Sequence, residues 1–325
     1  MTAKSMFDIP TVLTAEELLD KAFRKASKVE MSGRTKLETV RETNIAKIKS
    51  ASDVIVSTLG KYVKAFPSIE RQSRFYSELI DLAVGTDRLK HSLGAMDWCR
   101  GTVAKVAKSA TRTIAFSSSI SEIDETRRSA YGRISSLVKQ VGKELKILSD
   151  ARNAMRKFPA INPEEPTIVV AGAPNVGKSQ LVSRISSAKP RVAVYPFTTQ
   201  EISVGTFEKR YFRYQVIDTP GLLDRELDAR NPIELRAIVA LRHLADIILF
   251  VFDPTEACGY PMSQQERILE TIKREFSPVP VFEVENKSDL MKTKGGRTKI
   301  SAETGAGVQK LVDTLVAQLK DQQAL

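Results

Sequence analysis

The sequence has few of the residues that mark secreted or metal-binding proteins. Its 325 residues contain two cysteines, Cys99 and Cys258, and two histidines, too few and too scattered to predict a disulfide framework or a metal centre. No apolar run approaches the ~20 residues that a membrane-spanning helix needs, and the N-terminus lacks the apolar core of a signal peptide. We therefore expect free thiols in a reducing cytoplasm and no association with a membrane.

Proline is almost absent from the first 157 residues, which contain only Pro10 and Pro67. Apolar residues recur there at three- and four-residue steps, which is typical of helices that bury one face. We expect five helices, over residues 14–30, 45–66, 68–82, 89–110 and 119–155. We expect Trp98 in the core that these helices share. Long helices with short breaks indicate an all-α antiparallel bundle.

Acidic residues are too few in this region to balance the basic ones. Residues 1–160 contain 29 Lys and Arg against 18 Asp and Glu, whereas residues 161–325 contain 21 of each. The basic residues form helical stripes, which are Lys21, Arg24, Lys25 and Lys28; Lys105, Lys108 and Arg112; and Lys139, Lys143 and Lys146. A basic module beside a neutral one indicates a polyanionic partner, most often nucleic acid. The alternative is that the stripes are only solvated faces of bundle helices.

Three prolines between residues 158 and 166 end the helical region and predict a short, stiff connector. Strands alternate with helices beyond it, which predicts an α/β domain with a mixed, mostly parallel sheet and flanking helices. We expect strands at 167–171, 201–207, 211–218, 247–252 and 279–284, the second and third antiparallel, and helices at 264–275 and 308–319. The predicted domains are a basic helical bundle, residues 1–160, and an α/β domain, residues 161–325.

A glycine-rich loop follows the first of these strands. It fits the phosphate-binding pattern of Gly, four residues, Gly, Lys and Ser or Thr, and it consists of Gly172, Ala173, Pro174, Asn175, Val176, Gly177, Lys178 and Ser179, with Gln180 next in the following helix. Such a loop closes its backbone N–H groups around a β-phosphate at a helix N-terminus. Lys178 would reach the β- and γ-phosphates, and the Ser179 hydroxyl would ligate Mg²⁺.

Two motifs downstream are suited to sensing a third phosphate. Thr198 and Thr199 precede the second strand, where a threonine can ligate magnesium and bond the γ-phosphate through its N–H. Thr199 is the preferred candidate, and Thr198 is the alternative. The other motif ends the third strand and consists of Asp218, Thr219, Pro220 and Gly221. Asp218 would hold a magnesium-bound water, and the Gly221 N–H would contact the γ-phosphate.

Two further motifs are suited to binding guanine. They are Asn286, Lys287, Ser288 and Asp289 after the fifth strand, and Ser301, Ala302 and Glu303 after the last. The Asp289 carboxylate can accept hydrogen bonds from guanine N1 and N2, which adenine cannot offer. Asn286 would contact N7, the Lys287 stem would cover the base, and the Ala302 N–H would meet O6. Five motifs in this order, each at a strand end, predict a GTPase domain that binds GTP.

Further motifs extend along nearly the whole chain, at residues 75–79, 92–94, 130–134, 195–199, 213–221 and 258–260. With them the chain resembles the Nog (nucleolar GTP-binding protein) family of Obg-type GTPases. The resemblance implies a GTPase that acts in assembly of the large ribosomal subunit, its helical domain packed against ribosomal RNA. The implied partners are the precursor subunit and its rRNA, and ribosomal proteins are further candidates. We expect a monomer off the ribosome. The chain ends at Leu325, without the C-terminal extension of nucleolar members, which predicts a cytoplasmic short form.

One position affects the predicted mechanism. Leu222 follows Gly221, where Ras-like GTPases carry the glutamine that orients the attacking water. In GTPases with such a hydrophobic residue and an asparagine at the position of Asn175, a potassium ion can supply the missing positive charge. We therefore predict slow hydrolysis that potassium or the ribosomal particle stimulates. The predicted catalytic residues are Lys178, Asn175, Thr199 and Gly221, and the predicted magnesium ligands are Ser179, Thr199 and Asp218.

Two other functions fit parts of the same sequence. Leu222 also favours a GTP-dependent RNA- or ribosome-binding module with negligible intrinsic hydrolysis. A membrane-remodelling GTPase with a helical stalk is a second alternative, although the sequence contains no evident lipid anchor or amphipathic membrane helix.

Overall fold

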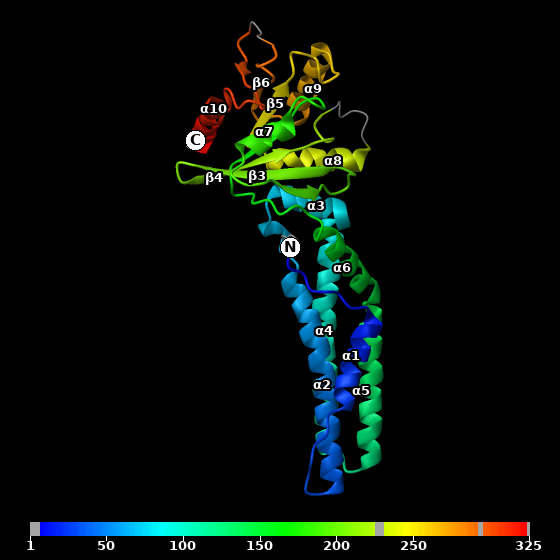
Figure 1. Cartoon of the computed structure of the whole chain (residues 1–325). Helices are drawn as coiled ribbons and strands as arrows, with labels where there is room; N and C mark the ends of the chain where they lie inside the picture. Colours follow the sequence, from blue (N-terminus) through cyan, green and yellow to red (C-terminus); the bar gives the residue numbers. More distant parts are fainter. Residues whose placement is uncertain (1–6, 225–230, 292–294, 324–325) are drawn as a thin grey trace. The chain divides into compact units, whose positions relative to one another are not determined.

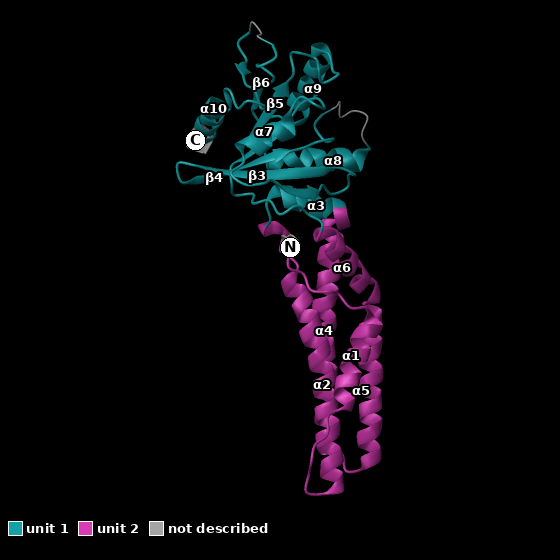
Figure 2. Ribbon diagram, in the orientation of Figure 1, with its two compact units in different colours: residues 1–6, 72–82, 157–325 teal, residues 7–71, 83–156 magenta. Residues whose placement is uncertain are grey.

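The computed structural model describes residues 7–224, 231–291 and 295–323 (Figure 1). The chain divides into two compact units (Figure 2). The helical unit contains residues 7–71 and 83–156, and the second unit contains residues 72–82 together with the described residues from 157 onward. This grouping differs from a single division at residue 160, because one helical segment from the first half packs with the second.

Five long helices build the helical unit, and side-chain caps fix where three of them begin. They are α1 (Ala15–Ser27), α2 (Lys36–Ala65), α4 (Thr86–Phe116), α5 (Ile120–Gln140) and α6 (Gly142–Met155). Thr14, Thr35 and Ser119 each accept a backbone N–H of the first helical turn, which satisfies a donor that the helix itself leaves unpaired. Helices α2, α4 and α5 pack along one another (Figure 1), as an antiparallel bundle requires.

Two expectations for these helices are wrong. The helix predicted over residues 119–155 is divided into α5 and α6 at Val141, which has φ −93° and ψ 14°, and Gly142, a poor helix former, begins α6. Trp98 is 51% exposed rather than buried. Met96, two residues earlier, is fully buried, and a step of two residues turns a side chain to the opposite face of a helix.

Helix α3 (Arg74–Val84), which follows a 3-10 turn (Ile69–Arg71), packs almost entirely with the second unit. The Tyr76 hydroxyl lies within hydrogen-bond distance of the carbonyl oxygens of Pro159 (2.7 Å) and Ile161 (2.8 Å), between which its single proton is shared, and it accepts the Ile161 N–H (3.1 Å). Burial raises the pKa of Tyr76 to about 12, so this hydroxyl keeps its proton. The segment predicted to be a connector is therefore anchored to α3 by hydrogen bonds.

A seven-stranded sheet forms the centre of the second unit. Its strands are β1 (Thr167–Ala171), β2 (Arg191–Val194), β3 (Glu201–Lys209), β4 (Phe212–Asp218), β5 (Ile247–Phe252), β6 (Val281–Glu285) and β7 (Thr298–Lys299). The strand order is β2-β3-β4-β1-β5-β6-β7. Strand β3 pairs antiparallel with β2 and β4, and all other pairs are parallel. The predicted mixed, mostly parallel α/β fold is confirmed, including the antiparallel pair.

Besides α3, the described part of this unit contains the helices α7 (Lys178–Ile185), α8 (Pro232–Ala240), α9 (Met262–Glu275) and α10 (Val308–Gln323), with a 3-10 turn at Leu241–His243. Sequence patterns missed β2 and α8, and they placed a last strand before Ser301 without giving its bounds, which is where β7 lies. Strand β2 is a mostly exposed edge strand and β7 has two residues, so neither carries a burial pattern. Helix α8 did carry a signal, because Asn231 caps it and Pro232 is its first residue.

Both cysteines are free and buried. Burial raises the pKa of Cys99 to about 11 and also raises that of Cys258, which keeps both thiols protonated and unreactive. Among the described residues, no helix has the length and apolar character needed to cross a membrane.

Candidate nucleotide-binding site

The phosphate-binding loop lies between the carboxyl end of β1 and the start of α7, at the edge of the sheet where α/β proteins bind ligands. Glycine is required at two of its positions. A Cβ on Gly172 would lie 2.4 Å from the Val251 carbonyl oxygen, and one on Gly177 would lie 2.3 Å from Asn286 Nδ2. Both residues also have positive φ, 136° and 97°. The loop can therefore pack against β5 and the Asn286 segment only with glycine at these two places.

Lys178 points into the loop. Its Nζ donates to the carbonyl oxygens of Gly172 and Ala173, both at 2.8 Å. Burial lowers the pKa of Lys178, although the nearby carboxylates of Asp224 and Asp218 oppose the shift. A buried ammonium surrounded by carbonyl oxygens and carboxylates is placed to bind phosphate oxygens at the mouth of the loop.

Asp218 and Ser179 have the chemistry of a magnesium site. Asp218 ends β4, is 1% exposed, and receives a hydrogen bond from the Ser179 side chain. Burial raises the pKa of Asp218, and its Oδ1 is a buried oxygen with no hydrogen-bond partner among the described residues. A buried oxygen of this kind needs a partner, and hard oxygen donors suit Mg²⁺. No cluster of three His, Cys, Asp or Glu side chains that could hold a metal ion occurs in the described chain; Mg²⁺ usually takes few protein ligands and completes its shell with phosphates and water.

The two candidate threonines differ in what their hydroxyls contact. The Thr198 hydroxyl donates to the Tyr195 carbonyl (3.0 Å) and accepts the Gln200 N–H (3.2 Å). The Thr199 side chain is exposed, and among the described residues its hydroxyl accepts a hydrogen bond only from the Gln200 side chain, at 3.3 Å. Thr198 therefore shapes the turn, and Thr199 has the hydroxyl better able to move to a metal ion.

The residues after β4 have separate structural roles. The Thr219 hydroxyl donates to the Val170 carbonyl at 2.8 Å, and both Thr219 and Leu222 are fully buried. The Gly221 N–H donates to Asp224 Oδ2 at 2.8 Å. Leu222 therefore packs in the core, so it cannot orient a water molecule at the phosphates.

Asn286 joins three of the predicted motifs. Its Nδ2 donates to the Val176 carbonyl of the phosphate-binding loop, and its Oδ1 accepts the Ala302 N–H, both at 2.8 Å. The side chain is buried, so this bridge is shielded from water. Asn286 thus holds the phosphate-binding loop and the Ala302 segment together. The Ala302 N–H, which is predicted to contact guanine O6, donates to Asn286 in this structure.

The residues predicted to bind the base and those predicted to bind the phosphates line two different cavities, here called the base side and the phosphate side. A cavity of about 260 Å³ is lined by Gln180, Asn286, Lys287, Asp289, Leu290 and Glu303. Another of about 360 Å³ is lined by residues 174, 175, 177–180 and 220 together with Asp224. Gln180 lines both and contacts Glu303. Ser288 and Ser301 support the base side: the Ser288 N–H donates to the Ile300 carbonyl oxygen, and the Ser301 Oγ accepts the Thr304 N–H.

Comparison with known proteins agrees with this geometry. The family described as NOG1 N-terminal helical domain matches residues 7–162, and that described as Nucleolar GTP-binding protein 1 (NOG1) matches residues 232–289. Residues 166–258 match the Ferrous iron transport protein B family. An uncharacterized protein of Methanocaldococcus jannaschii is 36% identical over 287 residues, 87% of this chain and 80% of its own length. The chain belongs to the Nog family.

Nucleolar members of the family are longer than this chain. Nucleolar GTP-binding protein 1 of Encephalitozoon cuniculi is 36% identical over 80% of this chain and 49% of its own length. That of Saccharomyces cerevisiae is 33% identical over 88% of this chain and 44% of its own length. The chain thus spans about half the length of these relatives. Family and fold together support binding of GTP and, in general terms, its hydrolysis.

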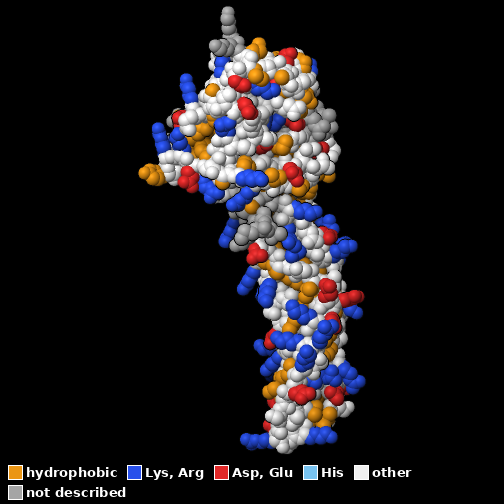
Figure 3. Space-filling view, in the orientation of Figure 1, with side chains coloured by type: hydrophobic (Ala, Val, Ile, Leu, Met, Phe, Trp, Pro, Cys, Tyr) orange, Lys and Arg blue, Asp and Glu red, His pale blue; other side chains and the backbone are white. Residues whose placement is uncertain are grey.

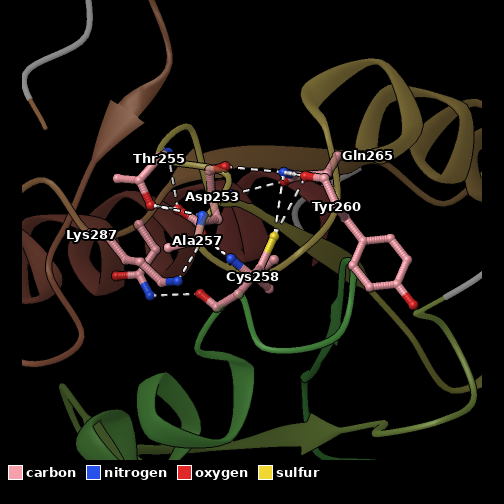
Figure 4. Close-up of polar contacts among 9 residues, drawn as sticks. Asp253, Thr255, Ala257, Cys258, Tyr260, Gln265 and Lys287 are labelled. Atoms are coloured by element: carbon pink, nitrogen blue, oxygen red, sulfur yellow. Dashed lines mark hydrogen bonds and ion pairs between the residues drawn. The ribbon is translucent and has the colours of Figure 1, made fainter. Parts of the chain in front are cut away.

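A buried network in this Nog-family protein holds Lys287, the lysine predicted to cover the base, and sequence patterns assigned this network no role. The Asp253 carboxylate, fully buried after β5, accepts Lys287 Nζ at 2.6 Å and the Cys258 N–H at 2.8 Å on Oδ2 (Figure 4). Its Oδ1 accepts the Thr255 hydroxyl (2.6 Å) and N–H (3.1 Å). Burial opposes ionisation of Asp253, but these hydrogen bonds hold its pKa below the usual value. A fixed negative charge therefore anchors the ammonium of Lys287.

Gln265 of α9 holds the loop that carries this carboxylate. Its side chain accepts the Asp253 N–H (2.9 Å) and donates to the carbonyls of Asp253 (3.0 Å) and Tyr260 (2.8 Å). The Tyr260 ring points away from Asp253 (Figure 4) and lines a further cavity of about 270 Å³ with Gly221 and Asp224. Residues 258–260 were noted in the sequence only as a family signature. The spacing from Asp253 to Lys287 gives no sign that they meet, because it depends on the parallel pairing of β5 and β6.

We predict that Asp253→Asn weakens binding of GDP and of a GTP analogue alike. Asparagine keeps the size of the side chain but removes the charge that anchors Lys287, whose stem would no longer be held over the base. Both dissociation constants should rise by about 5–20-fold, or ~1–2 kcal/mol, in a titration with fluorescent nucleotides.

The matched control is Asp246→Asn at the other end of β5, where the carboxylate accepts the Thr167 N–H at 2.7 Å. This variant also removes a carboxylate next to one end of β5, and it should leave both dissociation constants unchanged. Unaltered nucleotide binding by Asp253→Asn would show that Lys287 needs no anchor.

Proposed function

We propose that this protein is a GTP-hydrolysing molecular switch that acts in assembly of the large ribosomal subunit, with its helical domain, residues 1–160, bound to rRNA. The observation that carries the proposal is the convergence of the five nucleotide motifs at one edge of the sheet. The names of the nucleolar relatives support the ribosomal context. The predicted cytoplasmic location stays a prediction, and the relatives' names say nucleolar.

Each residue of the site then has a stated task. Lys178 and backbone N–H groups of the phosphate-binding loop bind the phosphates, while Ser179, Thr199 and Asp218 hold Mg²⁺ directly or through water. Mg²⁺ supplies positive charge that offsets the charge of the phosphates. Asp289, Lys287 and the residues around Ala302 bind guanine. The unbonded Oδ1 of Asp218 and the exposed Thr199 hydroxyl support this assignment.

We predict guanine selectivity that depends on Asp289. Its carboxylate lines the base cavity and can accept two hydrogen bonds that adenine cannot donate. Asp289→Ala should weaken GTP and GDP binding by ~2–4 kcal/mol, the range for a charge-assisted, partly buried pair. Competition of GTP and ATP against fluorescent GDP measures this directly, with the exposed Asp313→Ala as control. Equal competition by ATP against wild type would overturn the assignment of GTP.

Hydrolysis is proposed to be slow and to depend on a monovalent cation. Burial of Leu222 leaves no side chain at that position to orient water, and Asn175 lines the phosphate cavity with a left-handed backbone, φ 60°. We predict faster single-turnover hydrolysis in potassium than in sodium chloride, with Asn175→Ala removing the difference. Equal rates in the two salts would remove the cation from the mechanism and leave activation to the ribosomal particle.

Helix α3 offers a route from the nucleotide to the helical domain. Burial, with Glu78 and Tyr76 of α3 nearby, raises the pKa of Tyr195 well above its usual value, and the Tyr195 hydroxyl donates to Ala237 of α8. Glu78 also contacts His243 at 2.9 Å, and Asp81 contacts Arg236 at 3.3 Å. Tyr195 precedes the threonines, and α8 follows the segment after Gly221. Helix α3 thus lies against segments next to both proposed γ-phosphate sensors. Along the chain, α3 lies between α2 and α4.

The RNA-binding role rests on the surface of the helical unit. Lys105, Lys108 and Arg112 of α4 are exposed, and none of them forms an ion pair within the described chain. Trp98 lies seven residues before Lys105, and Phe116, 79% exposed, lies four after Arg112. These spacings place the aromatic rings on the same face of the helix as the stripe. Figure 3 shows Lys and Arg side chains along the helical unit in that view. Cationic groups bind phosphates and exposed rings can stack on bases.

We predict that changing Lys105, Lys108 and Arg112 together to Glu weakens cosedimentation with large-subunit precursors several-fold or more and leaves GTP affinity intact. Wild-type binding should fall steeply with salt, because phosphate contacts release counterions. It should be stronger with a GTP analogue than with GDP.

The control reverses Lys189, Arg191 and Lys310, three exposed residues of the second unit, and so changes the net charge equally. If the α4 variant cosediments like wild type, the stripe is only a solvated helix face.

The second candidate function, a GTP-dependent binding module with negligible hydrolysis, is favoured by the buried Leu222. Single-turnover hydrolysis with and without precursor particles separates the two.

A further inference from the structure

Asp224 accepts a hydrogen bond from the N–H group that the proposed switch needs to contact the third phosphate of GTP. Its Oδ2 accepts the Gly221 N–H at 2.8 Å, and the residue is 8% exposed. The Gly221 N–H is the group expected to contact the γ-phosphate of GTP. A single N–H cannot serve a buried carboxylate and a phosphate oxygen at full strength together.

The position of Asp224 places it at the phosphate end of the site. It lines the phosphate cavity with Lys178 and Pro220, and it also lines the neighbouring cavity with Gly221 and Tyr260. Its charge is close enough to Lys178 to act on the pKa of that ammonium. Among the described residues, the charged groups close to one another here are one cation, Lys178, and two carboxylates, Asp218 and Asp224. Asp218 has a task in holding the metal, and the motifs leave Asp224 without one.

Electrostatic repulsion makes the contact between Asp224 and Gly221 affect the binding of GTP and of GDP differently. A γ-phosphate that approaches the Gly221 N–H must displace the Asp224 carboxylate and also meets its negative charge at short range. Repulsion between like charges is strong in a poorly solvated site. GDP lacks the γ-phosphate, so its binding leaves the contact between Asp224 and Gly221 unchanged.

We propose that Asp224 is a specificity-determining residue that competes with the γ-phosphate for the Gly221 N–H and so lowers the preference for GTP over GDP. This inference rests on the proposed GTP-binding function. In the diphosphate form Asp224 holds the Gly221 segment in the arrangement seen here, and the γ-phosphate releases it. The residue thereby sets how much of the binding energy of the third phosphate is used to change the conformation of the switch.

The test compares a non-hydrolysable GTP analogue with GDP, both fluorescent and in excess Mg²⁺, on the full chain. Asp224→Asn keeps the size of the side chain, removes its charge and offers a donor to the phosphate; Asp224→Ala removes the competitor altogether. We expect both variants to bind the analogue about 5–30-fold more tightly than wild type and GDP within about twofold of wild type. The control is Asp313→Asn, an exposed carboxylate paired with Lys209 at 2.6 Å, which should change neither affinity.

Two results would overturn the inference while leaving the proposed function intact. One is an unchanged ratio of analogue to GDP affinity in both variants. The other is weaker binding of the analogue, which would make Asp224 a supporting ligand of the triphosphate state. If wild type binds neither nucleotide, the proposed function fails and the inference fails with it. The inference is established if the ratio of analogue to GDP affinity rises in Asp224→Asn and Asp224→Ala but not in Asp313→Asn, and if both Asp224 variants unfold thermally like wild type.

Discussion

The nucleotide site depends on close contact between the phosphate-binding loop and Asn286. The Asn286 side chain links the Val176 carbonyl to the Ala302 N–H, and its Nδ2 approaches Gly177 so closely that a Cβ there would clash. A buried polar side chain must satisfy its hydrogen bonds, and Asn286 does so only when β1, β6 and the loop after β7 are all in register. One amide thus holds the phosphate side and the base side at a fixed distance, which a nucleotide requires.

Two lysines near this frame lie close to buried carboxylates. Lys178 binds two carbonyl oxygens and lies near Asp218 and Asp224, and Lys287 is held by Asp253. Burying an ion without a partner would cost several kcal/mol. Lys178, in the phosphate-binding loop, and Lys287, which lines a cavity with Asp289, therefore each have carboxylate partners. Asp218 keeps one oxygen without a protein partner, and this is where the described chain offers most to a metal ion.

Helix α3 shows why a boundary drawn along the chain can separate residues that act together. Its sequence is amphipathic like its neighbours, with Phe75, Tyr76, Leu79 and Ile80 buried. That apolar face packs with the sheet unit, where Tyr76 bonds the backbone of residues 159–161. A periodic pattern states that a helix has a buried face. It does not state which unit that face is buried in.

The sequence by itself determined the fold class, the strands that carry alternating or continuous apolar residues, and the identity of the five nucleotide motifs. These depend on local spacing, such as glycines at positions that exclude a Cβ and strand ends that open into loops. Only the tertiary structure decided that Leu222 and Thr219 are buried, that Thr198 shapes its turn, and that Trp98 lies outside the core. It also brought Asp253 to Lys287 and Asp224 to Gly221. Asp253 meets Lys287 through the parallel pairing of β5 with β6, a long-range contact that no local pattern encodes. Asp224 is close to Gly221 in sequence, but its orientation toward that N–H depends on how the segment packs.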